Sequence, residues 1–314
     1  MTADIVADMD FLRRFEAGLN PMYPERSAIP AHILGYGEIS AVIACDVGNP
    51  GLAYKRMPLF ENEAEAEEYV ALYEDYTAVL AQTGLSPLPG KMVWLPKASG
   101  RGAVIYLLQP KLAAEAIAPA ALQNLAPAGG RALFAAVLDE FAKVFTFNAQ
   151  NRAELEIGFD GQLSNWAVAG FDPIRLVYFD TGTPLLRRNG REQINAEIFL
   201  RSAPSFLAWL LKRLFLADVV GRYYDGRKVC IDLLANLIKE QRPTLIPEVA
   251  AMCNERWAGE QTGFPPISSA EVQAYYREDA FIWRFYLGAR RLDRSLHKLA
   301  GKPYPHILPG AIKR

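Results

Sequence analysis

The sequence predicts an α+β fold in two lobes, a small strand-rich lobe over residues 1–110 and a larger, mostly helical lobe over residues 111–314. Two observations predict it. Short runs of β-branched and aromatic residues, separated by glycine and proline turns, dominate residues 30–110. After residue 130, most segments repeat their apolar residues with the period of an amphipathic helix.

The composition is that of an ordinary globular protein. Of the 314 residues, 51% are hydrophobic and 22% are charged, and the formal net charge is -1. A chain so balanced has no overall field that attracts nucleic acid, so nucleic-acid binding is not expected. Three cysteines and three histidines lie scattered along the chain, so we expect neither disulfides nor a cysteine- or histidine-based metal site. Such cysteine usage is typical of a reducing cytoplasm.

No segment is predicted to enter a membrane. The first ten residues are acidic and lack an apolar stretch, so a signal peptide is not expected. The most apolar stretch, residues 206–220, contains Lys212, Arg213 and Asp218 and is too short to span a bilayer. We expect a buried helix there and no membrane association, with a membrane-surface helix as the alternative.

A glycine-rich hairpin opens the strand-rich region, after a short amphipathic helix predicted over residues 8–18. Gly35, Gly37 and Ser40 form the pattern G-x-G-x-x-S between two apolar runs. Glycine lets backbone amides approach phosphate groups closely, because no Cβ stands in the way. Hairpins also use glycine for their turns, so a purely structural role is the alternative.

A lysine, Lys55, interrupts the apolar strand that follows, in the run L-A-Y-K-R-M. Such a cation can block an exposed sheet edge, or it can contact the phosphates of a nucleotide. The acidic helix predicted over residues 61–82 supplies carboxylates that would hold this lysine in place. Glu74 is the best candidate because it lies just past the middle of the helix, and Glu67 and Glu68 are alternatives.

Two further strands, predicted over residues 92–95 and 103–108, complete the strand-rich region. The second strand runs into Gln109 and Pro110, and a strand that breaks at a proline suits a hinge between two lobes. The backbone there would be free to hydrogen-bond the edge of an adenine. Gln109 is therefore a candidate cofactor-binding residue.

Residues 157–182 contain the pattern on which the functional prediction chiefly depends. Asp160 is followed five residues later by Asn165, and a strand-like run then leads to Asp180 and Gly182. In this spacing, one carboxylate can orient or deprotonate a hydroxyl, while an amide oxygen and a second carboxylate hold Mg²⁺ on phosphate groups. The same residue types fill ordinary turns, so a turn-rich loop between two strands is the alternative.

The order of these features resembles the protein-kinase-like fold over about residues 30–190. It is closest to the branch that includes aminoglycoside phosphotransferases and choline kinases. The matching segments are G-Y-G-E-I-S, A-Y-K, the acidic helix, F-D-G-Q-L-S-N and Y-F-D-T-G. Residues 205–215 and 222–243 also resemble an uncharacterised bacterial family near these kinases, from which no activity can be inferred.

The resemblance implies ATP and Mg²⁺ as cofactors. The loop over residues 35–40 would cover the phosphates, and Lys55, held by Glu74, would contact them. This assignment makes the strand-rich lobe the nucleotide-binding side of the protein.

The resemblance also implies roles in the second lobe, with departures from the kinase pattern. Asp160 would be the catalytic base, and Asn165 and Asp180 would bind Mg²⁺. The tripeptide Gly158-Phe159-Asp160 stands where these kinases carry H-R-D or H-G-D, whose histidine helps to brace the loop. No A-P-E segment follows Asp180, which argues against a protein kinase regulated by phosphorylation.

Helices account for most of the remaining second lobe. They are predicted over residues 193–200, 206–220, 228–239, 247–257 and 268–299, the last opened by the capping box S-S-A-E. Five basic residues of the last helix are expected on a solvated face, with a site for an acidic group of the substrate as the alternative. Its six aromatic residues between Tyr275 and Tyr286 are expected in the core.

Together these patterns predict a phosphotransferase that uses ATP and Mg²⁺ to phosphorylate a hydroxyl or amine of a small-molecule acceptor. Two alternatives are a pseudokinase that binds a nucleotide or a partner without turnover, and an enzyme that transfers AMP on the same fold. The acceptor, the choice between ATP and GTP, and the oligomeric state leave no readable pattern in the sequence.

Overall fold

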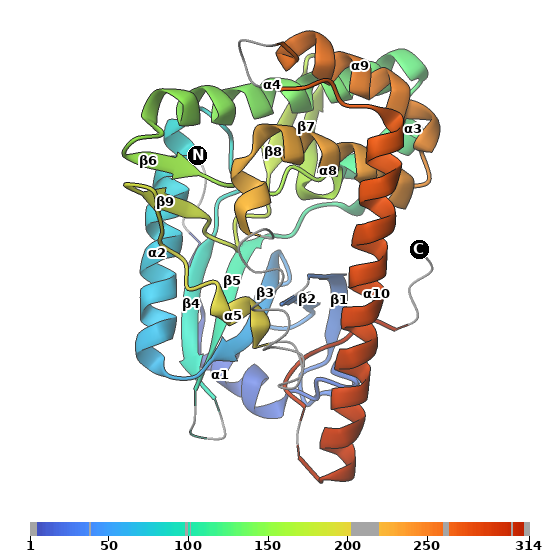
Figure 1. The fold of residues 1–314 in the computed structure, drawn as a ribbon. Coiled ribbons are helices and arrows are strands. Elements are labelled where there is room, and N and C mark those ends of the chain that lie inside the picture. The colour runs from blue at the N-terminus through green and yellow to red at the C-terminus, as the bar shows by residue number, and fades with distance from the viewer. Residues whose placement is uncertain are drawn as a thin grey trace.

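The computed structural model describes residues 5–37, 39–97, 100, 102–201, 220–259, 264–302 and 304–310. It has a sheet-based lobe on its N-terminal side and a mostly helical lobe on its C-terminal side (Figure 1). The elements of the first lobe are α1 (Met9–Gly18), η1 (Pro24–Arg26), β1 (Ala31–Tyr36), β2 (Ala41–Cys45), β3 (Leu52–Phe60), α2 (Glu63–Gln82), β4 (Lys91–Pro96) and β5 (Ala103–Pro110).

The sheet of the first lobe has five antiparallel strands in the order β1-β2-β3-β5-β4. Successive side chains of a strand point to opposite faces, so each face of β3 packs against a different helix. Tyr54 and Arg56 face α1, whereas Lys55 and Met57 face the side of α2 and the second lobe. One helix between the third and fourth strands of such a sheet is expected of a kinase-like small lobe. The predicted bilobal α+β fold is confirmed.

The helices of the first lobe begin at side-chain caps. The carboxylate of Asp8 accepts a hydrogen bond from the Phe11 amide at 2.9 Å, at the start of α1. The Asn62 side chain accepts from the Glu65 amide at 2.9 Å, so α2 begins at Glu63 and not at the predicted residue 61. Such caps satisfy amide groups that have no partner inside the helix.

The second lobe surrounds the loops that follow β6. Its elements are η2 (Ala114–Ala116), α3 (Ala118–Asn124), α4 (Pro127–Asn151), β6 (Leu155–Ile157), η3 (Leu163–Asn165), β7 (Trp166–Phe171), β8 (Ile174–Tyr178), β9 (Leu186–Arg188), β10 (Arg191–Glu192), α5 (Glu197–Leu200), η4 (Arg222–Tyr224), α8 (Gly226–Lys239), η5 (Pro243–Leu245), α9 (Ile246–Trp257) and α10 (Ser269–Leu299). Strands β7 and β8 form a two-stranded hairpin, and β6, β9 and β10 form a three-stranded sheet.

The core of this lobe is aromatic where it supports these loops. Phe141 of α4 packs edge-on against Phe159, with ring centroids 5.2 Å apart. Trp166 and Tyr178, which face each other across the β7–β8 hairpin, lie 5.1 Å apart. All four side chains are almost fully buried. The loops between β6 and β9 are therefore built on a rigid base.

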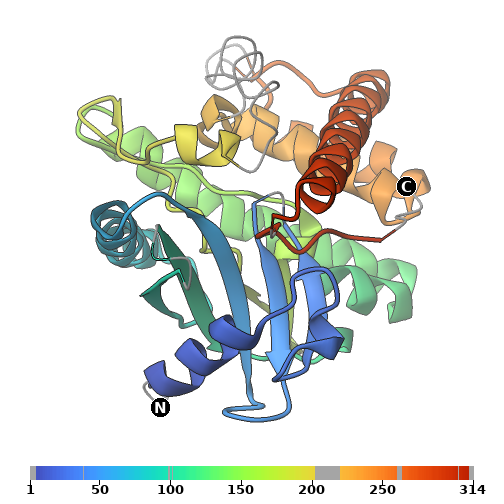
Figure 2. The ribbon, with the colours of Figure 1, turned by 90° about the horizontal axis from the view of Figure 1, so that it is seen from below.

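Helix α10 runs beside both lobes (Figures 1 and 2). The described segment that follows it, residues 304–310, turns back to the first lobe. There Arg56 donates from Nη1 to the carbonyl of Pro305 at 2.7 Å, and Ile307 joins the apolar cluster beneath α1. The two lobes are thus connected again through the end of α10.

Most predicted helices of the second lobe are confirmed within a few residues. The helix predicted over residues 193–200 shortens to α5, which begins only at Glu197, where the Asn195 side chain accepts a hydrogen bond from the Glu197 amide at 3.1 Å. The helix predicted over 206–220 lies outside the described residues except at Val220. In the described part of the chain, no helix has both the length and the apolar character needed to cross a bilayer. The division between the lobes at residues 110 and 111 stays a prediction.

Candidate active site

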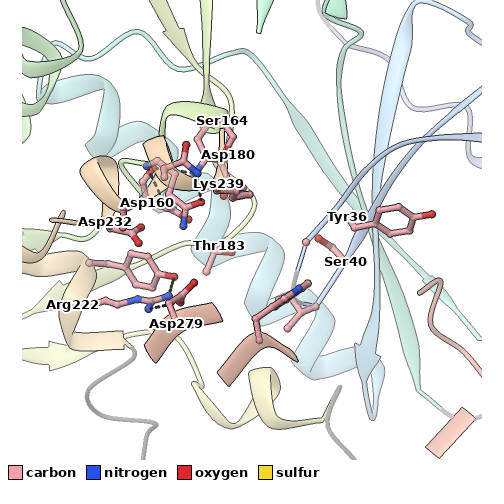
Figure 3. Close-up of a pocket in the computed structure, with 18 of the residues that line it drawn as sticks. Tyr36, Ser40, Asp160, Ser164, Asp180, Thr183, Arg222, Asp232, Lys239 and Asp279 are labelled. Atoms are coloured by element: carbon pink, nitrogen blue, oxygen red, sulfur yellow. Dashed lines mark hydrogen bonds and ion pairs between the residues drawn. The ribbon is translucent and has the colours of Figure 1, made fainter. Parts of the chain in front are cut away.

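A cavity of about 540 Å³ lies between the β1–β2 hairpin and the second lobe. Most of the predicted site residues line it: Gly37, Ser40, Lys55, Asp160, Asn165 and Asp180. Figure 3 shows Asp160, Asp180 and Asp232 on one side of this cavity and Ser40 of the hairpin on the other. Residues from distant parts of the sequence therefore meet at one place.

The loop that carries Asp160 is held by packing at its two neighbours. The Phe159 ring is buried and also packs edge-on against Tyr178, at 6.0 Å between centroids. A Cβ at Gly161 would lie 2.5 Å from Phe141 and 2.6 Å from Val229, so only glycine fits there. Phe159 thus anchors the loop from the core, while Gly158 stands at the histidine position of the kinase pattern.

The carboxylate of Asp160 has mainly negative neighbours. Its Oδ1 accepts a hydrogen bond from the Gln162 amide at 3.0 Å. Burial, followed by the negative charges of Asp232 and Asp180, raises the pKa of Asp160 to about 7, although the Gln162 amide and Arg222 act in the opposite direction. A carboxyl group with this pKa can accept a proton near neutral pH and release it again.

Asp180 follows β8 and forms an ion pair with Lys55. The Nζ of Lys55 lies 2.5 Å from Oδ1 of Asp180, and the side chains are 16% and 23% exposed. Gly182 makes room for the lysine, since a Cβ there would lie 3.0 Å from Nζ and Cδ of Lys55. The pair is therefore close-packed on one side and open to the cavity on the other.

Lys55 lies at the centre of the sheet. It pairs with Val42 of β2 on one side and with Leu107 of β5 on the other. Strands β2 and β5 flank β3, which is the middle strand of the sheet. The alternative that this lysine protects a sheet edge is therefore wrong.

The prediction that Glu74 holds Lys55 is also wrong. The Glu74 side chain is 59% exposed, and its carboxylate lies 3.6 Å from Nζ of Lys91. The alternatives Glu67 and Glu68 are exposed too. The face of α2 that looks toward the loops carries tyrosines, and Glu74 lies about 100° around the helix from the nearest, Tyr73.

The β1–β2 hairpin closes the cavity from the first lobe. The Gly37 amide donates to the Ser40 carbonyl at 3.0 Å across the turn. The hydroxyl of Ser40 is buried in the cavity wall and has no hydrogen-bond partner in the described structure. A buried polar atom that faces a cavity is a natural contact for a ligand, because leaving it unpaired costs free energy. Gly35 does not line the cavity, and a Cβ there would meet no atom within 4 Å.

Gln109 does not line the cavity either, although it was predicted as a cofactor-binding residue. Its amide Nε2 donates to the carbonyl of Phe179 at 3.0 Å and lies 3.4 Å from Oγ1 of Thr181. The side chain thus contacts the loop around Asp180 and not the cavity. It therefore supports this loop, and the contact of the backbone at Gln109 with an adenine stays a prediction.

The helices of the second lobe supply residues that the sequence analysis missed. Asp232 and Asn236 project from α8 into the cavity, although both are more than nine-tenths buried. Tyr275 of α10 donates to Oδ1 of Asp232 at 3.0 Å, and Arg222 donates to the Tyr275 hydroxyl at 3.3 Å. Arg222 also lies 3.7 Å from Asp279. A charged residue inside the apolar run V-C-I-D-L-L-A-N-L was the available signal.

A family model matches residues 25–295 of the chain, and its description is a family of unknown function, DUF6206. The protein belongs to the DUF6206 family. No curated protein matches this DUF6206 chain in sequence.

Among the matching solved structures is one described as WaaP in complex with acyl carrier protein. It has a TM-score of 0.33 and 14% sequence identity, and the match covers 82% of this chain and 98% of that chain. A TM-score this low supports no conclusion about function. The kinase-like assignment of this DUF6206 protein depends on its own strand order and loop geometry.

The donor set of the DUF6206 cavity fits a magnesium ion held together with phosphate groups. Asn165 donates from Nδ2 to the carbonyl of Asp160 at 3.2 Å, which leaves its amide oxygen for a ligand. Asp180 offers a carboxylate in the same cavity. The described residues contain no group of three or more histidine, cysteine, aspartate or glutamate side chains able to hold a metal ion by themselves. Mg²⁺ commonly takes one or two protein oxygens and completes its shell with phosphate and water.

Proposed function

We propose that the protein is a phosphotransferase that uses ATP and Mg²⁺ to phosphorylate a hydroxyl or amine of a small molecule. One observation carries the proposal. Lys55, Asp160, Asn165 and Asp180 line a single cavity, and the first and last of them form an ion pair there. These are the lysine, base and two metal ligands that phosphoryl transfer requires.

In this proposal Asp160 handles the proton. The acceptor hydroxyl or amine gives its proton to the Asp160 carboxylate as its oxygen or nitrogen forms a bond to the γ-phosphorus. The bond from the γ-phosphorus to the bridging oxygen breaks, and ADP leaves with the electron pair. A pKa raised to about 7 allows this carboxylate to be unprotonated in part of the molecules at neutral pH and to hold the proton afterwards.

Lys55 and the two metal ligands serve the phosphates. Asn165 and Asp180 would hold Mg²⁺, which when bound neutralises negative charge on the phosphate oxygens. Lys55 is within reach of the same space, and it would exchange its contact with Asp180 for contacts with phosphate oxygens. The unpartnered hydroxyl of Ser40 faces the cavity from the hairpin above.

The acceptor would enter from the side of α8 and α10. That end of the cavity presents Arg222, Asp232 and Asn236, together with aromatic side chains of α10. Both hydrogen-bond donors and acceptors are available there for a polar molecule.

The first test is thermal unfolding with and without Mg²⁺ and ATP, for the wild type and Asp180→Ala. Ligand at a hundredfold excess over its Kd adds roughly 2.7 kcal/mol to the stability of the folded state. We expect a metal-dependent shift in the wild type that Asp180→Ala loses. No shift in the wild type would contradict the proposal at its nucleotide site.

The second test is turnover of Asp160→Asn with a panel of small-molecule acceptors. We expect the variant to bind Mg²⁺ and ATP but to transfer no phosphate. Retained turnover would remove Asp160 from the role of base. Transfer of label from the α- but not the γ-phosphate would instead identify AMP transfer.

A second candidate function is nucleotide binding without turnover. The observation that favours it is the absence, among the described residues, of a helix carboxylate beside Lys55. Active protein kinases need such a lysine–glutamate pair. A nucleotide-dependent shift in the first test, combined with no product from any acceptor or from water, would support this second function.

A further inference from the structure

Helix α2 presents three tyrosines to the loops of the second lobe. Tyr69, Tyr73 and Tyr76 are spaced four and three residues apart, so they share one face of the helix. They are 3%, 3% and 0% exposed. This row occupies the face where the kinase resemblance places a glutamate for Lys55.

The two outer tyrosines hydrogen-bond the loops of Asp160 and Asp180, each at a residue two positions away from the aspartate. Tyr76 donates its hydroxyl hydrogen to the carbonyl of Gly158 at 3.2 Å, two residues before Asp160. Tyr69 donates to the carbonyl of Gly182 at 2.9 Å, two residues after Asp180. One rigid helix therefore fastens the loop of the proposed base and the loop of the proposed metal ligand.

The middle tyrosine reinforces the second of these attachments. The hydroxyl of Tyr73 interacts with the side chain of Thr181, which is fully buried. Gln109 reaches the same loop from β5 through the carbonyl of Phe179. The backbone from residue 179 to residue 182 is thus held from both α2 and the sheet.

The hydrogen bonds of Tyr69 and Tyr76 to the two loops do not depend on pH in the working range. Burial, with a further contribution from the charge of Asp180, raises the pKa of both Tyr69 and Tyr76 well above that of a free phenol. Both hydroxyls stay protonated at any working pH and can donate throughout. Moving either loop away would leave a buried hydroxyl without an acceptor, which costs free energy. The two hydrogen bonds therefore hold the loops in place.

We propose that Tyr69 and Tyr76 are positioning residues that set the distance between Asp160 and Asp180. The two hydroxyls are seven residues apart, which is roughly 10 Å along a helix. Because both bonds start from one helix, the two loops cannot separate without breaking one of them. The proposal rests on the phosphotransferase or nucleotide-binding function proposed above, and it gives α2 a task different from that of the usual glutamate.

The experiment compares Tyr69→Phe and Tyr76→Phe with the control Tyr54→Phe. Tyr54 lies on β3, is equally buried, and donates to the carbonyl of Asn49 at 3.4 Å on the opposite face of the sheet. Each variant loses one buried hydroxyl and keeps its ring. A general loss of packing would therefore affect all three alike.

The first readout is hydrogen–deuterium exchange of the full chain without ligand. We expect Tyr69→Phe to accelerate exchange in peptides covering residues 179–186, and Tyr76→Phe in peptides covering residues 158–165. The acceleration should be about five- to tenfold for one lost hydrogen bond. Tyr54→Phe should change neither region. Unchanged exchange in both loops would overturn the proposal, whether or not the protein binds a nucleotide.

The second readout is the ratio of the Kd for ATP in EDTA to the Kd in Mg²⁺. We expect Tyr69→Phe to reduce this ratio by about five- to tenfold, because the metal ligand loses its fixed position, while affinity in EDTA stays within about twofold. An equal loss in Tyr54→Phe would show a merely structural role and overturn the proposal. If the wild type binds no ATP, the proposed function fails, and the exchange readout alone decides whether α2 positions the loops.

Discussion

Two neighbouring residues of β3, Lys55 and Arg56, each form an ion pair, and the two pairs differ in every respect that matters for function. Arg56 is 4% exposed and forms a two-point pair with Glu16, at 2.8 and 2.6 Å. Tyr106 donates to the same carboxylate, and Arg56 also bonds the carbonyl of Pro305. Lys55 has a single ion pair, with Asp180, beside a cavity.

The difference separates an ion pair that is enclosed by the protein from one that faces a cavity, where we propose that it serves a nucleotide. The charges around Arg56 have their hydrogen bonds supplied by the protein, so nothing in that network is available to a ligand. The charges of Lys55 and Asp180 neutralise each other but keep open sides, so a phosphate and a metal ion can compete for them. Because side chains alternate along a strand, one residue step separates the two environments.

The largest effect on stability should come from Glu16→Gln. This substitution leaves the Arg56 guanidinium buried without a counter-charge, and breaking such a pair costs about 3–5 kcal/mol. Denaturant unfolding should show this loss. The stabilisation that Mg²⁺ and ATP add should persist in the variant, and its disappearance would contradict the separation of the two faces.

Lys55→Met should show the opposite behaviour. Removing one preorganised charge from a transition state lowers turnover by about 10²–10³-fold, and we expect a loss of this size in phosphate transfer. The unfolding free energy should fall by clearly less than in Glu16→Gln, because Asp180 keeps access to the cavity. A stability loss as large as that of Glu16→Gln would make the Lys55 pair structural as well.

The pH dependence of stability should differ in sign between Asp160 and Glu16. The pKa of Asp160 is raised to about 7, above its value of about 3.9 in an unfolded chain, so its contribution to stability falls as pH rises from about 4 to 7. Although burial acts to raise it, the Arg56 contacts and Tyr106 lower the pKa of Glu16, so its contribution is lost as pH falls below about 4.

Unfolding of Asp160→Asn and the wild type, measured between pH 4 and 8, checks this prediction. The two proteins should be similar near pH 4, and the variant should become the more stable one toward pH 8. Parallel curves would mean that Asp160 ionises normally in the folded protein. In an active enzyme, wild-type kcat/KM should rise with pH through about 7 as the base loses its proton.

The smallest effect should come from Glu74→Ala. Its carboxylate is exposed and pairs only with Lys91 at 3.6 Å in the described structure, so stability should change by no more than about 0.5 kcal/mol. Affinity for Mg²⁺ and ATP should not change. A tenfold loss of affinity would restore the predicted glutamate–lysine pair in the ligand-bound state.

The sequence could predict that the loops of Asp160, Asn165 and Asp180 meet at one cavity because the signals in these loops are local, whereas their roles stay predictions. Asp160, Asn165 and Asp180 stand at spacings that short-range chemistry fixes, and their loops end strands that the apolar pattern reveals. The bilobal fold followed from the same patterns. Lys55 was found because a cation inside an apolar strand needs an explanation.

The helices could not be read in the same way, because their contacts depend on which face turns inward. In α2, the spacing of the tyrosines indicates one buried face, but the sequence does not indicate that this face meets the loops of the second lobe or that Glu74 lies outside it. In α10, Phe281 and Phe285 were expected in the core but are 65% and 52% exposed. Asp232 of α8 could not be predicted as a site residue, because only tertiary packing places it beside Asp160.

The return of residues 304–310 to Arg56 has a mechanical consequence. Two lobes joined by a single connection can rotate apart about it. In this protein the segment after α10 also contacts the first lobe, which makes a second connection. This connection ends next to Lys55 on β3, while α10 itself forms a wall of the cavity. Wide rotation of the lobes would have to break this contact, so it restrains the opening of the cavity between them.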